Sequence, residues 1–238
     1  MPSTPSPSLE YSQQAFAFVD ILGFAQLVER SAQDDIARTL VARLLDTDHV
    51  FTEFMDFASV GRANFFSDSI VVSMASPEHY MLYMVREIGM LARYLLFQGF
   101  ASRGGITAGP VFHEGKAVVG PALVAAYRLE QRAIYPRIIL DAAALEYWRA
   151  EFRPDSPHPQ IEGWVKRDKD GEWFIDIFGP LWKHVLPMAQ VFDRAHDVPT
   201  DPDAFKAAVM PHIQRGCADS DPRIRAKWEW LCSECEGG

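Results

Sequence analysis

The chain has 238 residues, a net charge of −9 and 48% apolar residues, a composition typical of a globular protein. The acidic balance argues against a general nucleic-acid surface. No apolar run predicts a membrane span, because the most apolar helical stretch, 81–97, contains Arg86, Glu87 and Arg93. Three cysteines, all late in the chain, form no disulfide framework and favour a reducing, cytoplasmic location.

The N-terminal half begins with a Pro- and Ser-rich stretch, residues 1–10, which we expect to be a disordered lead-in. A buried strand follows from Phe16 to Asp20, and Gly23 then turns the chain into a helix. Apolar residues at helical spacing extend this predicted helix from Ala25 to about Phe54. Residues 57–75 read as a hairpin whose turn is Ser67-Asp68.

The middle of the chain continues the alternation of helices and strands. We expect a helix over 77–97, then two strands over 101–108 and 110–119 that are joined at Gly109, with a turn at Glu114-Gly115 in the second. A helix over 120–131 with an early proline, a strand over 136–140 and a short helix capped by Asp141 follow. The order strand–helix–strand–strand–helix–strand is typical of a ferredoxin-like α+β fold, with long helices over one face of an antiparallel sheet.

The C-terminal third, residues 151–238, is interpreted as an elaboration packed on the core of residues 11–150 or on a dimer. It begins with a proline-rich composition shift near 153–159. A hairpin over 163–177 turns at Lys169-Asp170-Gly171, and helices are expected over 201–214 and 222–232. Its sequence indicates no chemistry, and Cys232 and Cys235 are interpreted as ordinary thiols rather than zinc ligands.

Two aspartates carry the chemical signal of the sequence. Asp20 ends a strand and Asp68 lies in a hairpin turn, so the two carboxylates can meet at neighbouring strand ends. Carboxylate oxygens are the ligands that hard divalent cations prefer. The glycine turn after Asp20 enters a helix, where free amides can bind phosphate. The pattern therefore suggests a metal–nucleoside triphosphate site, although each residue alone also fits a turn or a helix cap.

Four ordered blocks stand out in the sequence: Phe18-Val19-Asp20-Ile21-Leu22-Gly23-Phe24, Ser67-Asp68, Arg103-Gly104-Gly105-Ile106-Thr107-Ala108-Gly109 and the helix from Gly120-Pro121 to Glu130. Together they resemble one known family, the class III nucleotidyl cyclases. The resemblance implies a cyclase core over residues 11–150 with a C-terminal hairpin and helical elaboration. It also implies a homodimer with active sites at its interface.

The resemblance assigns roles to matching positions. Two Mn²⁺ or Mg²⁺ ions would be held by Asp20, Asp68 and the backbone carbonyl of Ile21. Amides of Leu22, Gly23 and Phe24 would cradle the phosphates of a nucleoside triphosphate. Arg128 would stabilise the transition state, although it also fits an ordinary surface arginine.

The departures from the family pattern concern the base. In the family, the residue four before the second metal aspartate recognises the purine, and this chain has Asn64 at that position. At the family's other base-recognising position this chain has Ala117. Neither purine code is present, and an amide can donate to and accept from a pyrimidine edge. The pattern is most similar to the bacterial pyrimidine cyclases of the Pycsar anti-phage systems. That similarity implies conversion of UTP or CTP to a cyclic monophosphate that activates a separate effector protein.

Two further departures leave other functions open. Val124 replaces the asparagine that usually holds the ribose, and the usual triphosphate lysine is not identifiable, so Arg137 is the substitute that we predict. The alternatives are a catalytically inactive nucleotide sensor or partner-binding domain, and a purine cyclase with a divergent pocket. No nucleic acid partner and no membrane span are expected.

Overall fold

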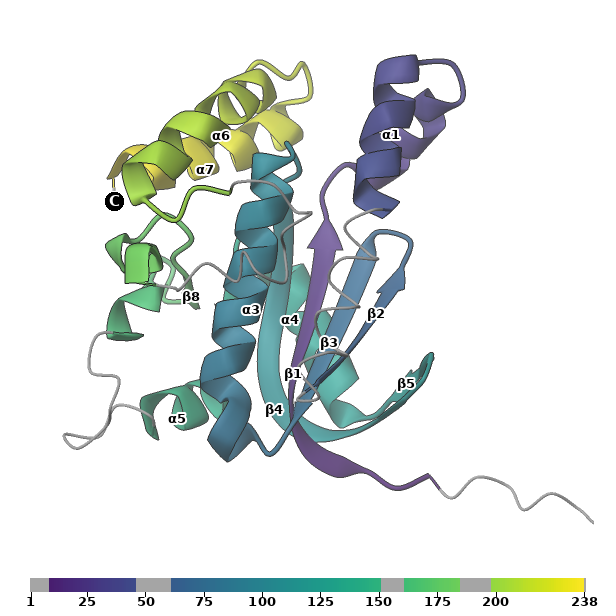
Figure 1. Cartoon of the computed structure of the whole chain (residues 1–238), viewed down its shortest axis with the longest axis vertical. Helices are drawn as coiled ribbons and strands as arrows, with labels where there is room; N and C mark the ends of the chain where they lie inside the picture. The colour runs from purple at the N-terminus through teal and green to yellow at the C-terminus, as the bar shows by residue number, and fades with distance from the viewer. Residues whose placement is uncertain (1–8, 46–60, 151–160, 185–197, 238) are drawn as a thin grey trace, which may run out of the picture.

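The computed structural model describes residues 9–45, 61–150, 161–184 and 198–237. Figure 1 shows them as one twisted sheet with helices on both faces and a pair of C-terminal helices beside the sheet. Within these residues, no helix combines the length and the apolar character needed to cross a membrane.

The sheet is mixed and mostly antiparallel. Its strands are β1 (Ser12–Ile21), β2 (Gly61–Phe66), β3 (Ser69–Ala75), β4 (Ser102–Glu114), β5 (Ala117–Val119), β6 (Ile138–Leu140), β7 (Val165–Arg167) and β8 (Trp173–Ile175). They lie in the order β2-β3-β1-β4-β6-β8-β7, and β5 pairs with β4 alone. The first four strands pair antiparallel in the ferredoxin-like order, whereas β6 lies parallel to β4. The predicted α+β fold is confirmed.

The helices cover both faces, which corrects the expectation of a single covered face. They are α1 (Phe24–Ser31), α3 (Pro77–Phe97), α4 (Pro121–Ala133), α5 (Ala142–Ala150), α6 (Pro202–Cys217) and α7 (Pro222–Gly237), with 3-10 turns at Ile161–Trp164 and Pro180–His184. Along β1, Ala15, Ala17 and Val19 belong to the same core cluster as α3, while Phe16 packs with α4. Successive strand residues point to opposite faces, so β1 contributes both to the apolar core under α3 and to the apolar core under α4.

Two predicted elements are wrong in their limits. The helix expected over 25–54 stops after Ser31, and a new helix covers 35–45, because the carboxylate of Asp34 accepts the amides of Ile36 and Ala37 and caps a fresh start. The rest of that expected helix, and the start of the hairpin expected from Phe57, lie outside the described residues.

The second correction concerns the break expected at Gly109. β4 runs unbroken from Ser102 to Glu114, because β1 pairs with it from Ser12 to Ile21 and holds it extended. The turn follows at Gly115 and Lys116, and it leads into β5.

Other predicted elements are confirmed. Ser67 and Asp68 form the turn between β2 and β3, and the turn between β7 and β8 lies at residues 168–171. The carboxylate of Asp141 accepts the amide of Ala144 at 2.9 Å and caps α5. Both C-terminal helices form as expected.

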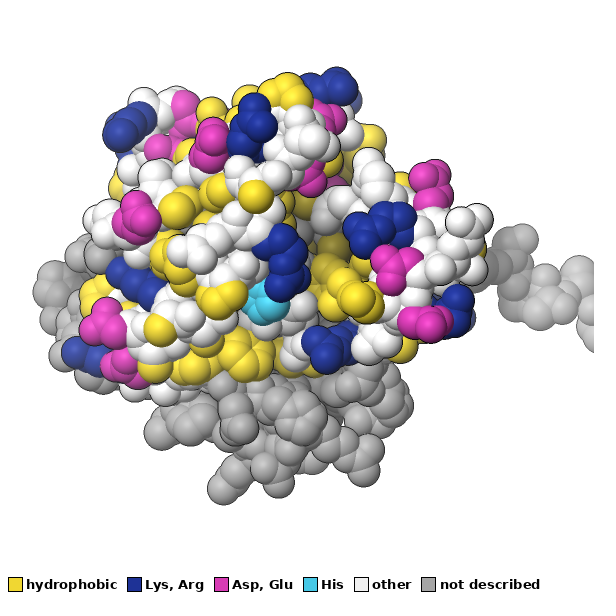
Figure 2. All heavy atoms as spheres, turned by 90° about the horizontal axis from the view of Figure 1, so that it is seen from above, with side chains coloured by type: hydrophobic (Ala, Val, Ile, Leu, Met, Phe, Trp, Pro, Cys, Tyr) yellow, Lys and Arg dark blue, Asp and Glu magenta, His cyan; other side chains and the backbone are white. Residues whose placement is uncertain are grey.

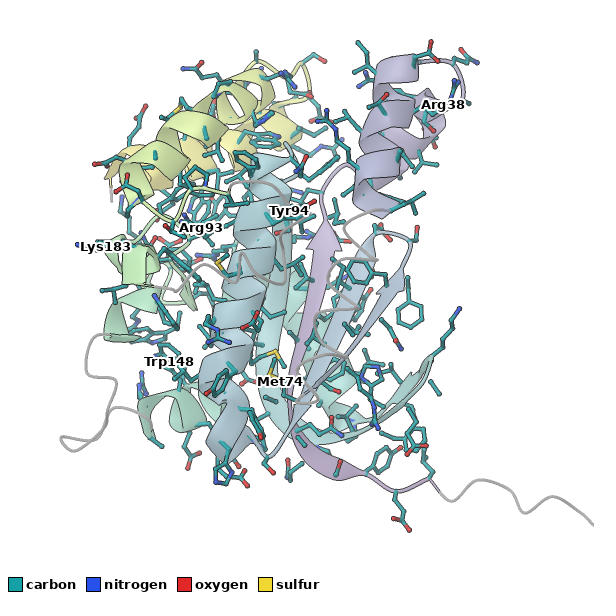
Figure 3. The ribbon with its side chains drawn as sticks, in the orientation of Figure 1. Arg38, Met74, Arg93, Tyr94, Trp148 and Lys183 are labelled. Atoms are coloured by element: carbon teal, nitrogen blue, oxygen red, sulfur yellow. The ribbon has the colours of Figure 1, made fainter. Side chains whose placement is uncertain are left out.

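A buried arginine joins the C-terminal segment to the core. Arg93 on α3 lies on the side turned toward that segment (Figure 3) and donates to the carbonyls of Ile177 and Pro199. Its guanidinium lies 3.7 Å from the ring centroid of Phe205 in α6. Burial lowers the pKa of Arg93 to about 9, which still leaves it charged at neutral pH. The C-terminal helices are therefore anchored by a desolvated charge as well as by apolar packing.

Candidate functional site

The fold brings Asp20 and Asp68 to adjacent strand ends. Asp20 lies near the end of β1, opposite Ser69 of β3, and Asp68 lies in the turn just before Ser69. The amide of Ile21 donates to the carbonyl of Asp68 at 2.9 Å, which ties the turn to the end of β1. In Figure 1 this strand points toward the end of the molecule where α1, α6 and α7 lie.

Asp20 is held in an environment that disfavours its charge. Burial raises the pKa of Asp20 to about 6, and the negative charges of Glu130 and Asp68 add to this. The guanidinium of Arg103, whose Nε lies 3.5 Å from the carboxylate, lowers the pKa and offsets part of the effect. Asp20 is only 19% exposed and sits near two other carboxylates, so Arg103 compensates its negative charge only in part.

That deficit fits a bound cation. Carboxylates on neighbouring strand ends, with backbone carbonyls beside them, are the oxygen donors that Mg²⁺ and Mn²⁺ take. Among the residues that the structure describes, no group of three or more His, Cys, Asp or Glu side chains is placed to hold a metal ion. Further ligands would therefore come from backbone, water or the phosphates of a substrate.

The turn after β1 presents amides to the same end of the sheet. Gly23 adopts φ 79° at the start of α1, a left-handed conformation that glycine accepts without strain, and a Cβ placed on it would meet no atom within 4 Å. The helix start carries no side-chain cap. The amide of Leu22 donates to the carbonyl of Ala101 at 2.9 Å, so it cannot also point at a phosphate. The predicted cradle is thereby reduced to Gly23 and Phe24.

A mostly apolar, open groove of about 510 Å³ is lined by neighbours of Asp20, although not by Asp20 or Asp68 themselves. Phe18, two residues before Asp20 on β1, lines it, as does Ser69, which pairs with Asp20. The other lining residues come from β2, β3, β5 and α4 and from the turn before β5: Phe66, Val71, Lys116, Ala117, Val118, Val119 and Leu123. Its size and lining are those of a small-molecule site.

The two predicted base readers lie at the edge of this groove. Ala117 begins β5 and lines it. Asn64 lies on β2, and its side-chain amide donates to the carbonyl of Gly115 at 2.9 Å, two residues before Ala117. Asn64 and Gly115, 51 positions apart in sequence, thus meet beside the groove, because β2 and the turn between β4 and β5 lie side by side.

The face of α4 that carries Arg128 is exposed. Val124 is 48% exposed, and Tyr127 and Arg128 are also exposed. The ring of Tyr127 packs edge-on against Phe18 at 5.5 Å. Within the described residues, Arg128 forms no hydrogen bond or ion pair, so this chain alone does not bring it to Asp20.

Arg137 lies in a different environment from the one that we predicted. Its side chain is 1% exposed, and it forms ion pairs with Asp168 and Asp170 of the turn between β7 and β8. The guanidinium also lies near the rings of Tyr135, Phe174 and Trp230. Its charge is therefore already balanced by two carboxylates, and the structure gives no support to a triphosphate role.

Two charged residues near Asp20 were missed from the sequence. Glu130 on α4 is buried and contacts Arg103, which also faces Asp20. Lys227 on α7 lies close enough to Arg103, Asp20 and Glu130 for their charges to shift its pKa, although burial is the larger effect and lowers it. Figure 2 looks onto this end of the molecule and shows acidic and basic side chains intermixed. Glu130 lies two residues after Arg128, so the two side chains point to different sides of α4. Only the packing of α4 against β4 and α7 reveals that Arg103 and Lys227 are the cations near Glu130.

No protein-family model and no curated protein sequence matches the chain. Solved structures do match in fold. The adenylyl cyclase CyaB from P. aeruginosa aligns over 71% of this chain and 95% of its own, with a TM-score of 0.52 and 15% identity. A bacterial light-regulated adenylyl cyclase aligns over 80% of this chain and 58% of its own, with a TM-score of 0.50 and 14% identity. The chain therefore has the fold of the class III nucleotidyl cyclases.

Proposed function

We propose that the protein is a nucleotidyl cyclase that converts a pyrimidine nucleoside triphosphate, UTP or CTP, to its 3′,5′-cyclic monophosphate and pyrophosphate. The observation that carries this proposal is the placement of Asp20 and Asp68 at adjacent strand ends, beside a groove of nucleotide size, in a cyclase fold. A nucleotide-binding protein would also need the groove, but two adjacent carboxylates, together with the raised pKa of Asp20, favour metal-assisted chemistry.

The chain's own residues would divide the work as follows. Asp20, Asp68 and the carbonyl of Ile21 would hold two divalent cations, Mn²⁺ or Mg²⁺, which lower the pKa of the ribose 3′-hydroxyl and neutralise phosphate charge. The amides of Gly23 and Phe24 would bind the leaving phosphates. The 3′-oxygen forms a bond to the α-phosphorus, the bond to the bridging oxygen breaks, and pyrophosphate leaves while the hydroxyl proton passes to solvent.

Pyrimidine selectivity is supported by the rim of the groove. Asn64 already donates one amide hydrogen to the carbonyl of Gly115, which fixes its side chain at the turn that leads to Ala117. A fixed amide can read the donor and acceptor edge of uracil or cytosine, while alanine offers no contact to a purine. Phe66 and Phe18 narrow the groove with apolar surface.

A homodimer is part of the proposal. Arg128 would stabilise charge at the α-phosphate, and it lies on an exposed face of α4 without an ion pair to the Asp20 of its own chain. Val119, Val124 and Tyr127 expose apolar surface around it. Two copies meeting over this face would cover that surface and bring Arg128 of each to the metal site of the other. As in the anti-phage systems that the sequence resembles, the cyclic product would activate a separate effector.

A substrate series tests the proposal. Purified protein is incubated with each of ATP, GTP, CTP and UTP in Mn²⁺ or Mg²⁺, and products are identified by mass spectrometry beside an Asp68→Ala control. We expect a cyclic monophosphate from UTP or CTP alone and none from the control. Product from ATP or GTP would contradict the base assignment made from Asn64 and Ala117.

A second candidate, a catalytically inactive nucleotide sensor, is favoured by one observation. Val124, an apolar residue, occupies the α4 face beside Arg128 where a ribose-binding amide is expected, and it is half exposed. Nucleotide binding in calorimetry with no product from any of the four triphosphates would establish this alternative.

A further inference from the structure

One arginine lies between two carboxylates of different elements. Arg103 of β4 faces Asp20 across the pairing of β1 and β4, with its Nε 3.5 Å from the Asp20 carboxylate. The same Nε makes a closer contact with Oε1 of Glu130 from α4. The cation is thus shared, and it lies nearer to Glu130.

Glu130 places a carboxylate in a buried position, where its charge tends to destabilise the fold. Its side chain is 3% exposed, and burial raises its pKa, while Arg103 lowers it. A buried carboxylate without a cationic partner destabilises a fold by several kcal/mol. Arg103, at 24% exposed, is the cation that contacts it. Stability alone would be served better by an apolar residue in the packed interface of α4 and β4, so the ion pair points to another role.

We propose that Glu130 is a positioning residue that holds Arg103 away from Asp20 and so keeps the Asp20 carboxylate available to a divalent cation. This inference rests on the metal site of the proposed function and adds the device that keeps the site free. In this role Glu130 acts through its contact with Arg103, in addition to the effect of its own negative charge on Asp20.

The physical reason is competition for one carboxylate. Without Glu130, the nearest anion to Arg103 is Asp20, 3.5 Å away, and a small side-chain movement would complete an arginine–carboxylate pair. That pair would partly neutralise the negative charge of the Asp20 carboxylate and occupy an oxygen that would otherwise bind the divalent cation. Lys227 of α7 is a second cation whose charge interacts with those of Asp20 and Glu130.

The test is a double-mutant cycle on metal affinity in the full chain. Mn²⁺ binding is measured by calorimetry and by the loss of the free-ion electron paramagnetic resonance signal. The variants are Glu130→Gln, Arg103→Gln and the double variant, with Asp20→Asn to identify the site. We expect Glu130→Gln to weaken Mn²⁺ binding about tenfold when Arg103 is present and less than about threefold when Arg103 is glutamine.

Two matched variants separate position from charge. Glu130→Asp keeps the charge but shortens the reach by one methylene, so it should weaken Mn²⁺ binding much as Glu130→Gln does. Lys227→Gln removes a nearby positive charge without touching Arg103, so the Glu130→Gln effect should persist in that background. Thermal melting of each metal-free variant confirms that it is folded before binding is measured.

The outcomes are distinguishable. The inference would be overturned if Glu130→Gln weakened Mn²⁺ binding equally with Arg103 and with glutamine at position 103, or if Glu130→Asp kept the wild-type Mn²⁺ affinity. Either result would mean that Glu130 acts only through the electrostatic effect of its negative charge, and the metal site itself would stand. Mn²⁺ binding that is absent in the wild type, or unchanged by Asp20→Asn, would overturn both the inference and the metal site of the proposed function.

Discussion

Asp20 is a residue whose charge costs the metal-free protein stability. Its pKa is about 6 in the folded protein, against an ordinary value near 3.8, chiefly because it is buried. Between these values the folded chain keeps the proton that the unfolded chain has lost, so the free energy of unfolding falls as pH rises from about 4 to 6. A buried carboxylate with a raised pKa is typical of a functional site.

We therefore expect Asp20→Asn to stabilise the metal-free protein. At pH 8 in a chelator the variant should gain about 1–3 kcal/mol in the free energy of unfolding, and the gain should disappear below pH 4. Melting curves at several pH values measure this. Added Mn²⁺ should raise the melting temperature of the wild type but not that of Asp20→Asn. A variant that melts below the wild type at pH 8 would contradict the account.

At the scale of elements, α4 packs closely against β4, and two glycines of β4, Gly105 and Gly109, differ in the space that they leave for a side chain. A Cβ at Gly105 would lie 2.1 Å from the Cβ of Leu129 and 2.8 Å from the carbonyl oxygen of Ala126. A Cβ at Gly109 would meet the Cβ of Ala122 at 3.5 Å, which is ordinary contact. The close approach also sets how Glu130, one residue after Leu129, reaches Arg103.

Gly105→Ala should accordingly destabilise the protein by about 1–3 kcal/mol, because α4 or β4 must shift to admit the methyl group. The matched substitution Gly109→Ala should change the free energy of unfolding by less than about 0.5 kcal/mol. Urea unfolding followed by circular dichroism measures both. Equal effects of the two substitutions would show that the spacing of α4 and β4 adapts, and that the contact at Leu129 does not constrain it.

At the scale of the whole molecule, the site that we propose is incomplete in one chain. Asp20 and Asp68 lie together at one end of the sheet, whereas Arg128 is exposed on α4 and forms no ion pair with either of them. An interface that covers Val119, Val124 and Tyr127 would bury apolar surface and supply the missing charge from the second copy.

Mixed dimers test this arrangement. Chains with Asp20→Asn and chains with Arg128→Ala, carried on different affinity tags, are co-expressed, and the heterodimer is purified through both tags. Each homodimer should be inactive, and the heterodimer should recover about half of the wild-type turnover because one of two sites is intact. An inactive heterodimer that is folded and dimeric would mean that Arg128 acts on the Asp20 of its own chain or has no catalytic role.

The local patterns of the sequence determined the elements and the identity of the paired aspartates. Alternation and helical spacing predicted β1, the β2–β3 hairpin, α3 and α4, because these periods follow from backbone geometry alone. The break at Asp34 was also readable in principle, since an aspartate before a helix start is a capping signal. The predicted strand break at Gly109 was wrong because local turn propensity yields to pairing with β1 along the whole strand.

Only the tertiary structure decided which polar groups are available for chemistry. The sequence by itself supplied the candidates Asp20, Gly23, Asp68 and Arg128. The fold committed the Leu22 amide to Ala101 and the Arg137 guanidinium to Asp168 and Asp170, and it placed Glu130 against Arg103. A hydrogen bond or an ion pair depends on residues far apart in the chain, whereas the period of a strand or a helix is written in neighbouring residues. The sequence therefore determined the elements and the chemical groups, and packing decided which of those groups remain free to act.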